Sequence, residues 1–382
     1  MSIHFRLGND HKPVEDFLAR NPEGVGGIVL DAKNARYQEA AAEVAVTAGL
    51  QVTYEPATER LATAGYGLEK YPCYGGVNPY DLGELFEDPG SRSRLVERVV
   101  SAHPDVVTTV TAPHFYVAGL DTAHLNVALA EETRLSQHKP VRAVATIANK
   151  VARSHAAVIA VEYADAGIRS VELRLSPLGG DDEGLAKLRE AFAVLDAFRA
   201  AGLHVTLGQS GTIGHLAVAL GHADAYSVGV GMLEQVNHSS VVWRQKQPPK
   251  PREDDDTGGG PTAGVYLGGL EATTRRRTAA QLLENTSIRT RIGCRIDACG
   301  ESIRGPLVDV RTHYLHSRAG AMAEMLRVPA PWRATAQMER LKGAIDLRRR
   351  VNQHYLSPEV NELKLRTLRS LVDDVEAQRQ AS

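Results

Sequence analysis

The segment 141–175, VRAVATIANKVARSHAAVIAVEYADAGIRSVELRL, contains one complete strand–helix–strand unit and guides the reading of the rest of the chain. Its two ends, 141–147 and 169–175, are short runs rich in β-branched residues, and the apolar residues between them recur at helical spacing. Asp165-Ala166-Gly167 ends the helical stretch, because glycine readily adopts the left-handed conformation that follows a helix. This order of elements predicts a βαβ unit with two parallel strands.

The same alternation runs through most of the chain. We predict strands at 27–31, 51–55, 105–111, 141–147, 169–175, 203–208, 224–229 and 264–268. Helical patterns lie at 34–48, 91–102, 121–136, 150–166, 182–201, 212–221 and 272–286. Successive βα units in this number predict an α/β fold of the (β/α)8 TIM-barrel type. An open, doubly wound sheet is the alternative, but no GxGxxG motif follows the first predicted strand.

Two irregular segments and a helical tail complete the predicted organisation. Residues 65–90 are rich in Gly, Pro and Tyr, and residues 244–263 combine prolines, a charge run and glycines. Beyond about residue 290 the strand pattern ends, and helices are predicted at 317–327, 333–354 and 359–379. We therefore expect a barrel over 1–290, with loop insertions at 65–90 and 244–263, followed by a helical appendix over 291–382.

Composition excludes several classes of protein. The chain has 382 residues, of which 43% are hydrophobic and 24% are charged, as expected for a globular protein with a sizeable core. It contains no run of about 18 apolar residues and no apolar stretch typical of a signal peptide. We therefore expect a cytoplasmic protein with no membrane partner. Three cysteines are too few for a disulfide framework.

The net charge of −2 conceals a basic segment. Residues 261–350 hold 16 Lys and Arg against 8 Asp and Glu, whereas residues 1–260 hold 24 against 33. Arginine clusters are typical of surfaces that bind phosphate groups, so we predict that Arg275, Arg276 and Arg277 bind nucleic acid. The alternative is a set of helix faces whose arginines pair with nearby acids.

Polar residues near strand ends supply the catalytic candidates, because TIM-barrel chemistry takes place at the C-terminal ends of the strands. Glu172 and Arg174 alternate with apolar residues in one predicted strand, so both should face the barrel interior. Buried charges are costly unless they are paired or used, so this pair is either catalytic or a structural ion pair in the barrel floor. Asp31 is the third catalytic candidate, with helix capping as its alternative role.

Glycine-rich turns after later predicted strands supply the binding candidates, which are Gln209, Ser210, Gly229, Gly231, Gly268 and Gly269. Glycine backbones allow a phosphate or a planar base to approach closely. Gln209 offers both a donor and an acceptor, and alternation with Val205 and Leu207 is expected to turn its amide toward the pocket. The alternative is that these glycines only shape tight turns.

Four cysteine and histidine side chains supply a candidate metal site. Zinc prefers four N or S ligands in a closed structural site, and these candidates are Cys294, Cys299, His313 and His316. The two histidines are three residues apart and can share one helix face. The alternative is that the cysteines are small buried apolar residues and the histidines are surface or capping residues.

Five motifs in the same part of the chain resemble the tRNA-guanine transglycosylase superfamily, including its DNA-modifying relatives that insert deazaguanines. The motifs are GQSG at 208–211, YSVGVGMLEQ at 226–235, GVYLGG at 264–269, Cys294-x4-Cys299 and HYLHSRAGAMAEM at 313–325. The resemblance implies a glycosyltransferase that exchanges a base in tRNA or DNA. It also implies that Gln209 and the turn from Gly229 to Gly231 read the purine, and that Cys294 and Cys299 are zinc ligands.

Departures from this family leave its chemistry open. Ile296 stands at the middle cysteine position and Gly269 at the position of the nucleophilic aspartate. TAPHFYV follows the third predicted strand, where the family has its general-base aspartate. The resemblance therefore implies either a diverged enzyme with carboxylates from other strands or a member that binds without catalysing.

Three functional hypotheses follow. The first is a transglycosylase-like protein that handles a guanine or deazaguanine base in nucleic acid. The second is a TIM-barrel enzyme for a small phosphorylated metabolite, with phosphate on the glycine turns and acid–base work by Glu172 or Asp31. The third is a non-catalytic interaction subunit within a homo- or hetero-oligomer.

Overall fold

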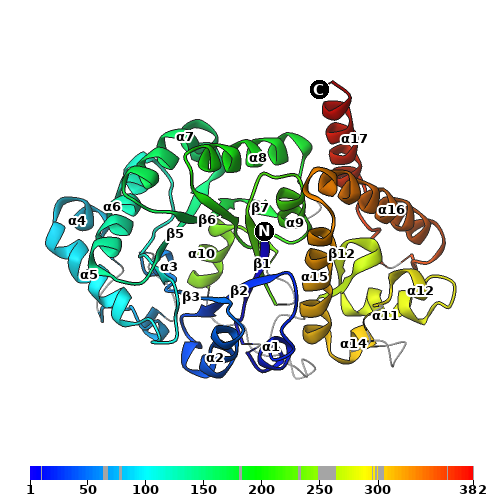
Figure 1. The fold of residues 1–382 in the computed structure, drawn as a ribbon, viewed down its shortest axis with the longest axis horizontal. Coiled ribbons are helices and arrows are strands. Elements are labelled where there is room, and N and C mark those ends of the chain that lie inside the picture. The colour runs from blue at the N-terminus through cyan, green and yellow to red at the C-terminus, as the bar shows by residue number, and fades with distance from the viewer. Residues whose placement is uncertain are drawn as a thin grey trace.

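Eight parallel strands form the centre of the computed structural model, which describes residues 1–9, 11–62, 68–76, 80–179, 183–230, 234–247, 264–294, 296, 299, 305–358 and 360–381. The strands are β1 (Ser2–Arg6), β2 (Val25–Asp31), β3 (Gln51–Glu55), β4 (Val110–Thr111), β5 (Val141–Ala148), β6 (Ser170–Ser176), β8 (His204–Leu207) and β9 (Ala225–Gly229). They are hydrogen-bonded in the order β3-β2-β1-β9-β8-β6-β5-β4, and a parallel bridge between Thr53 and Thr109 joins the two outer strands. The sheet therefore closes into the predicted TIM-type barrel (Figure 1).

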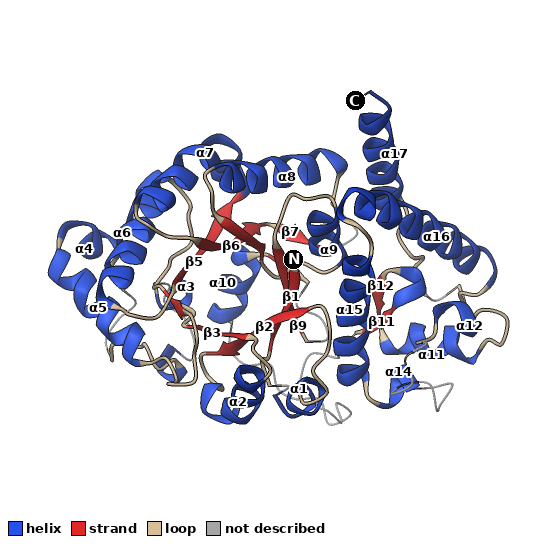
Figure 2. Cartoon of the chain, viewed as in Figure 1, coloured by secondary structure: helices blue, strands red, loops and turns tan. Residues whose placement is uncertain are grey.

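Helices surround this barrel, as the blue ribbons around the red strands in Figure 2 show. They include α1 (His11–Leu18), α2 (Glu39–Thr47), α5 (Pro89–Ser101), α6 (Leu120–Ser136), α7 (Asn149–Asp165), α8 (Leu185–Ala200) and α9 (Thr212–Ala219). Apolar strand residues such as Val171 and Leu173 are fully buried beneath the helices. Since neighbouring side chains in a strand point to opposite faces, the alternate residues of β6 face the barrel interior.

The first barrel strand corrects the predicted set of strands. β1 lies between β2 and β9, in the place predicted for the segment 264–268. Its interior-facing residues, His4 and Arg6, are polar, so the sequence here lacks the apolar run that is typical of a buried strand. Phe5 packs edge-on against Phe17 of α1. As a consequence, GQSG follows the seventh barrel strand in chain order, and Gly229 ends the eighth.

The segment 264–268 belongs to a separate hairpin. β11 (Val265–Leu267) pairs antiparallel with β12 (Ala272–Thr274), and the two form a sheet of their own. They share a second hydrophobic cluster with α11 (Arg276–Glu284), α12 (Arg289–Ile292), α14 (Gly305–Val308) and α16 (Arg333–His354). The hairpin therefore packs with the helices that follow it, and the expected division at residue 290 stays a prediction.

Helix α15 (Val310–Arg327) lies between this C-terminal part and the barrel (Figure 1). Gly24, whose φ is +83°, packs against it so closely that a Cβ atom there would lie 2.8 Å from the carbonyl oxygen of Ala319. α17 (Arg366–Ala381) ends the described chain and covers much of the predicted helix 359–379. The predicted helix 333–354 coincides with α16.

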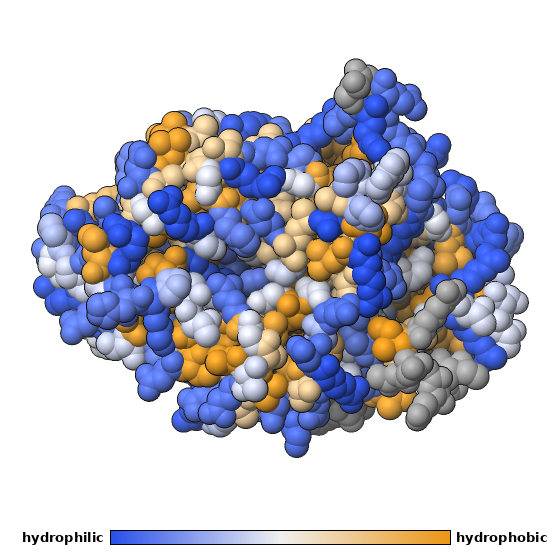
Figure 3. Space-filling view, in the orientation of Figure 1, coloured by the Kyte–Doolittle hydropathy of each residue, from blue (hydrophilic) through white to orange (hydrophobic). Residues whose placement is uncertain are grey.

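The two predicted loop insertions are only partly described. Residues 63–67, 77–79 and 248–263 lie outside the described residues, whereas α4 (Leu82–Glu87) and α10 (His238–Lys246) fall within or beside the insertions. Figure 3 shows a mainly hydrophilic surface over α16 and α17 on the face in view. No helix in the described parts of the chain is both long and apolar enough to cross a membrane.

Candidate functional site

Glu172 of β6 lies at the centre of a charged network inside the barrel. Its Oε1 atom accepts a 2.7 Å hydrogen bond from Nε of Arg174, and its Oε2 atom accepts a 2.9 Å bond from Nη1 of Arg142. Arg6 of β1 adds an ion pair of 3.3 Å, and the hydroxyl of Ser227 donates at 3.4 Å. Burial would raise the pKa of Glu172, but the guanidinium groups of Arg174, Arg142 and Arg6 lower it to about 2.

The predicted interior position of Glu172 and Arg174 requires a glycine opposite them. A Cβ atom on Gly208 would lie 2.7 Å from Oε1 of Glu172 and 2.7 Å from Cγ of Arg174. Position 208 therefore faces the interior, and Arg6, Arg142 and Gly208 complete a set that was not predicted from the sequence. A signal was present in β1 and β5, because each of these strands contains one arginine directly beside a buried apolar residue, Phe5 or Ala143.

Glu55 joins this network to the end of β3. Its Oε2 atom accepts hydrogen bonds from Arg174 and, at 3.3 Å, from Arg6, while its Oε1 atom accepts the backbone N–H of Ala57 at 3.1 Å. Ala57 has a φ of 54°, in the left-handed region that is unfavourable for a residue with a Cβ atom. The chain then enters the short helix α3 (Thr58–Leu61), which carries Glu59.

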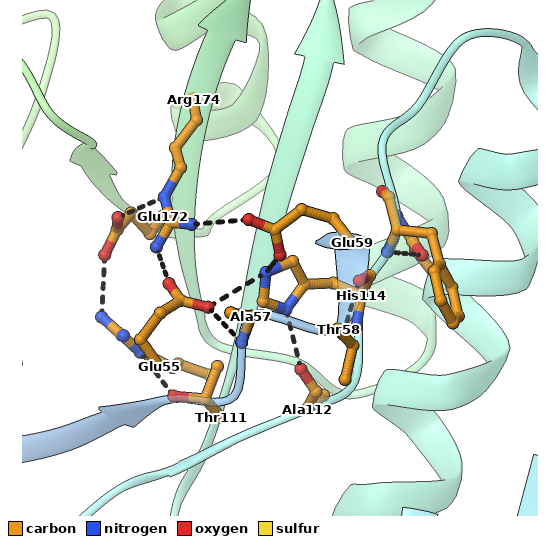
Figure 4. Close-up of polar contacts among 12 residues, drawn as sticks. Glu55, Ala57, Thr58, Glu59, Thr111, Ala112, His114, Glu172 and Arg174 are labelled. Atoms are coloured by element: carbon orange, nitrogen blue, oxygen red, sulfur yellow. Dashed lines mark hydrogen bonds and ion pairs between the residues drawn. The ribbon is translucent and has the colours of Figure 1, made fainter. Parts of the chain in front are cut away.

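His114, in the loop after β4, lies between Glu55 and Glu59 (Figure 4). Its Nε2 atom is 3.3 Å from Oε1 of Glu55 and 3.1 Å from Oε2 of Glu59, and its Nδ1 atom is 3.1 Å from the carbonyl oxygen of Ala112. The Thr58 hydroxyl fixes this loop, because it donates to the carbonyl of His114 at 2.6 Å and accepts its N–H at 2.8 Å.

Nε2 of His114 thus lies within 3.3 Å of two carboxylates, and Nδ1 lies beside a carbonyl oxygen, which favours the doubly protonated imidazolium. Burial opposes the charge, but the carboxylates of Glu55 and Glu59 raise the pKa of His114 to about 9. Burial likewise opposes the charge of Glu59, yet the contact with His114 lowers the pKa of that carboxyl to about 2. The two groups therefore form a charged pair at neutral pH.

Charge and exposure define what this cluster can bind. Arg6, Arg142, Arg174 and the His114 imidazolium outnumber the carboxylates of Glu55, Glu59 and Glu172 by one positive charge. Arg6 and Glu59 are the most exposed members, with 13% and 12% of their side chains accessible, whereas the other five are at most 5% exposed. An anion that enters the barrel would therefore meet Arg6 and Glu59 first.

Only some of the remaining predicted residues lie beside this cluster. Gly229 ends β9 beside Arg6, and the backbone N–H of Gln209 donates to Ser227 Oγ at 3.1 Å. Gln209 has a φ of 51°, which is not a strand conformation. The alternation with Val205 and Leu207, which predicted the direction of its amide, therefore stops before Gln209. The Ser210 hydroxyl donates to the carbonyl of Leu207, and Gly231 lies outside the described residues.

Asp31 and the two glycines Gly268 and Gly269, which were also predicted as site residues, make other contacts. Oδ1 of Asp31 accepts the backbone N–H of Lys33 and the side-chain amide of Asn34, both at 3.0 Å, in a local turn that does not cap a helix, because Asn34 is the N-cap residue of the next helix, η1 (Ala35–Tyr37). Gly268 and Gly269 lie in the short 3-10 helix η3 (Gly268–Leu270), outside the barrel. A Cβ atom on Gly269 would lie 2.1 Å from the carbonyl oxygen of Arg291, so close packing explains that glycine.

The cysteine and histidine candidates form a second cluster, on α15 and the segment before it. The Sγ atom of Cys299 lies 3.1 Å from Nε2 of His316 and 3.4 Å from Nδ1 of His313, and Sγ of Cys294 lies 3.4 Å from Nε2 of His316. All four ligand atoms are within 4.8 Å of one another. Tetrahedral zinc, with bonds of about 2.0 Å to N and 2.3 Å to S, needs similar separations of about 3.3–3.8 Å.

The orientation of His313 also fits a metal ligand. Its Nε2 atom lies 2.6 Å from the carbonyl oxygen of Tyr266 and therefore donates to it, which leaves the lone pair of Nδ1 directed toward the cysteines. Metal-binding histidines commonly donate their other N–H in this way. Four protein ligands leave no open position, so the arrangement suits a structural ion.

Comparisons with known proteins do not assign a family. No protein-family model and no curated protein match the chain. A 3-dehydroquinate dehydratase from Geobacillus kaustophilus HTA426 is 10% identical over 64% of this chain and 88% of its own, with a TM-score of 0.36. A mandelate racemase/muconate lactonizing enzyme from Jannaschia sp. CCS1 is 11% identical over 66% and 67%, with a TM-score of 0.33.

A third solved structure is the carboxyl transferase domain of Rhizobium etli pyruvate carboxylase with 3-bromopyruvate. It is 14% identical over 64% of this chain and 43% of that chain, with a TM-score of 0.33. Identities and TM-scores this low do not indicate a function. We therefore infer the function from the side chains of the site itself.

Proposed function

We propose that this protein is a TIM-barrel enzyme that transfers protons on a small phosphorylated metabolite at the carboxyl end of the barrel. The observation that carries the proposal is the His114–Glu59 pair, with a distance of 3.1 Å between Nε2 and Oε2. A partly accessible carboxylate beside a buried imidazolium is suited to accept and return a proton. The excess of one positive charge in the cluster favours an anionic substrate.

In this proposal Glu59 is the catalytic residue and Arg6 binds the phosphate. With a pKa of about 2, Glu59 alone is a weak base. A bound anion raises the pKa of a neighbouring carboxyl, because two negative charges then share one site. Substrate binding therefore makes Glu59 a better proton acceptor, and His114 holds its carboxylate in place. Glu55, Glu172 and Arg174 act as positioning residues.

Hydrogen exchange tests proton transfer directly, whatever the complete reaction is. The protein is incubated with a panel of sugar phosphates and phosphorylated hydroxy and keto acids in deuterated water, and deuterium incorporation is followed by NMR. Glu59→Gln should reduce the exchange rate by about 100-fold or more. The matched control is Glu43→Gln on the exposed surface of α2, which should not alter exchange. Equal exchange in the Glu59→Gln variant and the wild type would overturn the proposal.

A transglycosylase-like function is the second candidate, and the four converging zinc-type ligands favour it. In this case Gln209 would read a guanine or deazaguanine, and Arg275, Arg276 and Arg277 would contact tRNA or DNA. The position of GVYLGG outside the barrel counts against it, because the resemblance places the nucleophile in that segment. Incorporation of labelled guanine into tRNA or DNA would support this candidate. Absence of both incorporation and hydrogen exchange would favour the non-catalytic subunit.

We also propose that Zn²⁺ binds to Cys294, Cys299, His313 and His316. The ion would connect the start of α15 to the segment that contains the two cysteines. Its role would be structural, because four protein ligands complete its coordination. This proposal does not depend on which of the two functions is correct.

A further inference from the structure

A cavity of about 380 Å³ lies in the C-terminal part of the protein. β12, the first turn of α11, Arg348 of α16 and the segment 360–364 line it. It shares no residue with the charged network inside the barrel. Its volume is within the range of small-molecule sites in proteins, roughly 300–1,000 Å³.

Among the described residues that line this cavity, basic side chains outnumber acidic ones. Arg275, Arg277, Arg348 and Lys364 line it, together with the two acids Glu234 and Glu362. Glu234 already binds other groups, because it forms an ion pair with Arg318 and accepts hydrogen bonds from Tyr314 and Thr273. The cavity therefore favours an anionic ligand.

Helix α11 presents its N-terminus to the same cavity, since Arg275, Arg277 and Thr278 are lining residues. The first helical backbone bond runs from the N–H of Ala279 to the carbonyl of Arg275, and Arg275 makes no capping bond with its side chain. The N–H groups of the first turn thus have no acceptor within the helix. The positive end of the helix dipole therefore favours a bound anion at this cavity.

Arg348 gives the cavity a fixed cationic wall. Its side chain is 1% exposed, and it donates to the carbonyl oxygens of Leu270 at 2.7 Å, Lys364 at 2.7 Å and Glu271 at 2.8 Å. These bonds connect α16, η3 and the segment 360–364 through one guanidinium. The charge on this wall is therefore positioned by the fold before any ligand arrives.

We propose that this cavity is a second binding site, specific for a phosphate group. A tetrahedral dianion matches the guanidinium groups that line the cavity and the N–H groups at the start of α11, with the Thr278 hydroxyl beside them. The phosphate belongs either to free inorganic phosphate or to a phosphate ester such as a nucleoside monophosphate. The proposal does not depend on the proposed function, because it concerns binding in a different part of the protein.

Isothermal titration of the full-length protein with inorganic phosphate and with guanosine 5′-monophosphate tests the site. Guanosine, which has no phosphate group, is titrated as the control ligand. Arg275→Gln and Arg277→Gln should each weaken phosphate binding by about tenfold, as expected for the loss of one charge-assisted contact. Tighter binding of the monophosphate than of phosphate would identify an ester as the ligand, and equal binding would identify the free anion.

Arg276→Gln is the matched control, because Arg276 belongs to the same triplet but is not among the lining residues and donates to the carbonyl of Leu307 at 2.6 Å. It should change phosphate affinity by less than about twofold. Equal weakening by all three substitutions would show diffuse surface attraction and overturn the proposal, as would no weakening by any. Thermal unfolding of each variant checks that the fold is intact. Retention of deuterium exchange in Arg277→Gln separates this site from the barrel site.

Discussion

The Nε2 atom of His114 lies 3.1 Å from Oε2 of Glu59, although the two residues follow different barrel strands. Glu59 follows β3 and His114 follows β4, the two strands that meet where the barrel closes at Thr53 and Thr109. Closure of the barrel therefore brings together the acid and the base of the candidate site.

Stability should depend on pH through His114. Its folded-state pKa of about 9 exceeds the ordinary value of 6.5, so its stabilising contribution is complete below pH 6.5 and is lost as pH rises toward 9. Urea unfolding should show that the gap in free energy between the wild type and His114→Gln shrinks by up to about 3 kcal/mol over that interval. A gap that does not vary with pH would contradict the imidazolium.

Glu59 should impose the opposite dependence at low pH. Its pKa falls from 4.5 to about 2 in the folded state, so its contribution is complete above pH 4.5 and is lost as pH falls toward 2. The gap between the wild type and Glu59→Gln in free energy of unfolding should therefore decrease from pH 4.5 downward. Because the pair is largely buried, about 1 M salt should leave this behaviour in place. Loss of the effect in salt would indicate a solvent-exposed pair.

Removal of the central carboxylate should strongly destabilise the barrel. Glu172→Gln leaves Arg142 and Arg174 buried without their shared partner, at an expected cost of about 3–5 kcal/mol in free energy of unfolding. Glu190→Gln is the control, because Glu190 pairs with Arg153 at 3.3 Å on the exposed surface and should cost at most about 1 kcal/mol. Similar costs for the two variants would argue against a buried network.

The purified protein should contain one zinc ion per chain, measured by inductively coupled plasma mass spectrometry. Cys299→Ser should lose the metal, and a chelator should lower the melting temperature of the wild type by about 2–4 °C for each kcal/mol of stabilisation lost. Cys73→Ser is the control, since Cys73 is buried in the barrel core and should leave the zinc content unchanged. Metal content that is equal in both variants would exclude this cluster as the zinc site.

Substitution by alanine should have different effects on stability at the two glycines of η3. A Cβ atom at position 269 would lie 2.1 Å from a backbone carbonyl, whereas at position 268 its nearest neighbour is a Tyr266 ring atom at 3.9 Å. Gly269→Ala should therefore cost about 1–3 kcal/mol of stability, and Gly268→Ala should cost less than about 0.5 kcal/mol. Chemical denaturation measures both costs. Equal tolerance would mean that the backbone here adapts without strain.

Substitutions at Gln209 should distinguish backbone strain from recognition of a purine. Its left-handed backbone favours glycine, so Gln209→Gly should be as stable as the wild type or more stable by up to about 1 kcal/mol, unlike Gln209→Ala. If the amide reads a purine, both variants should lose about 1–3 kcal/mol of guanine binding while phosphate binding is unchanged. Unchanged guanine binding in both variants would remove the recognition role of Gln209.

Regular elements were the most predictable part of this protein. The βαβ unit at 141–175 and the helix at 333–354 appear as predicted, because hydrophobic periodicity is a local property of the chain. The interior position of Glu172 and Arg174 followed from the same alternation within one strand. The spacing of Cys294, Cys299, His313 and His316 also indicated a cluster, because the four residues are close in sequence.

The sequence by itself thus determined the barrel class, most of its strands and the candidate metal ligands. Only the tertiary structure decided that Ser2–Arg6 is the first strand of the barrel and that the hairpin at 265–274 lies outside the barrel. It also decided that Glu59, rather than Asp31, lies against His114. The physical reason is that strand pairing and pKa values depend on distances between residues far apart in the chain, which local patterns of hydrophobicity and charge do not encode.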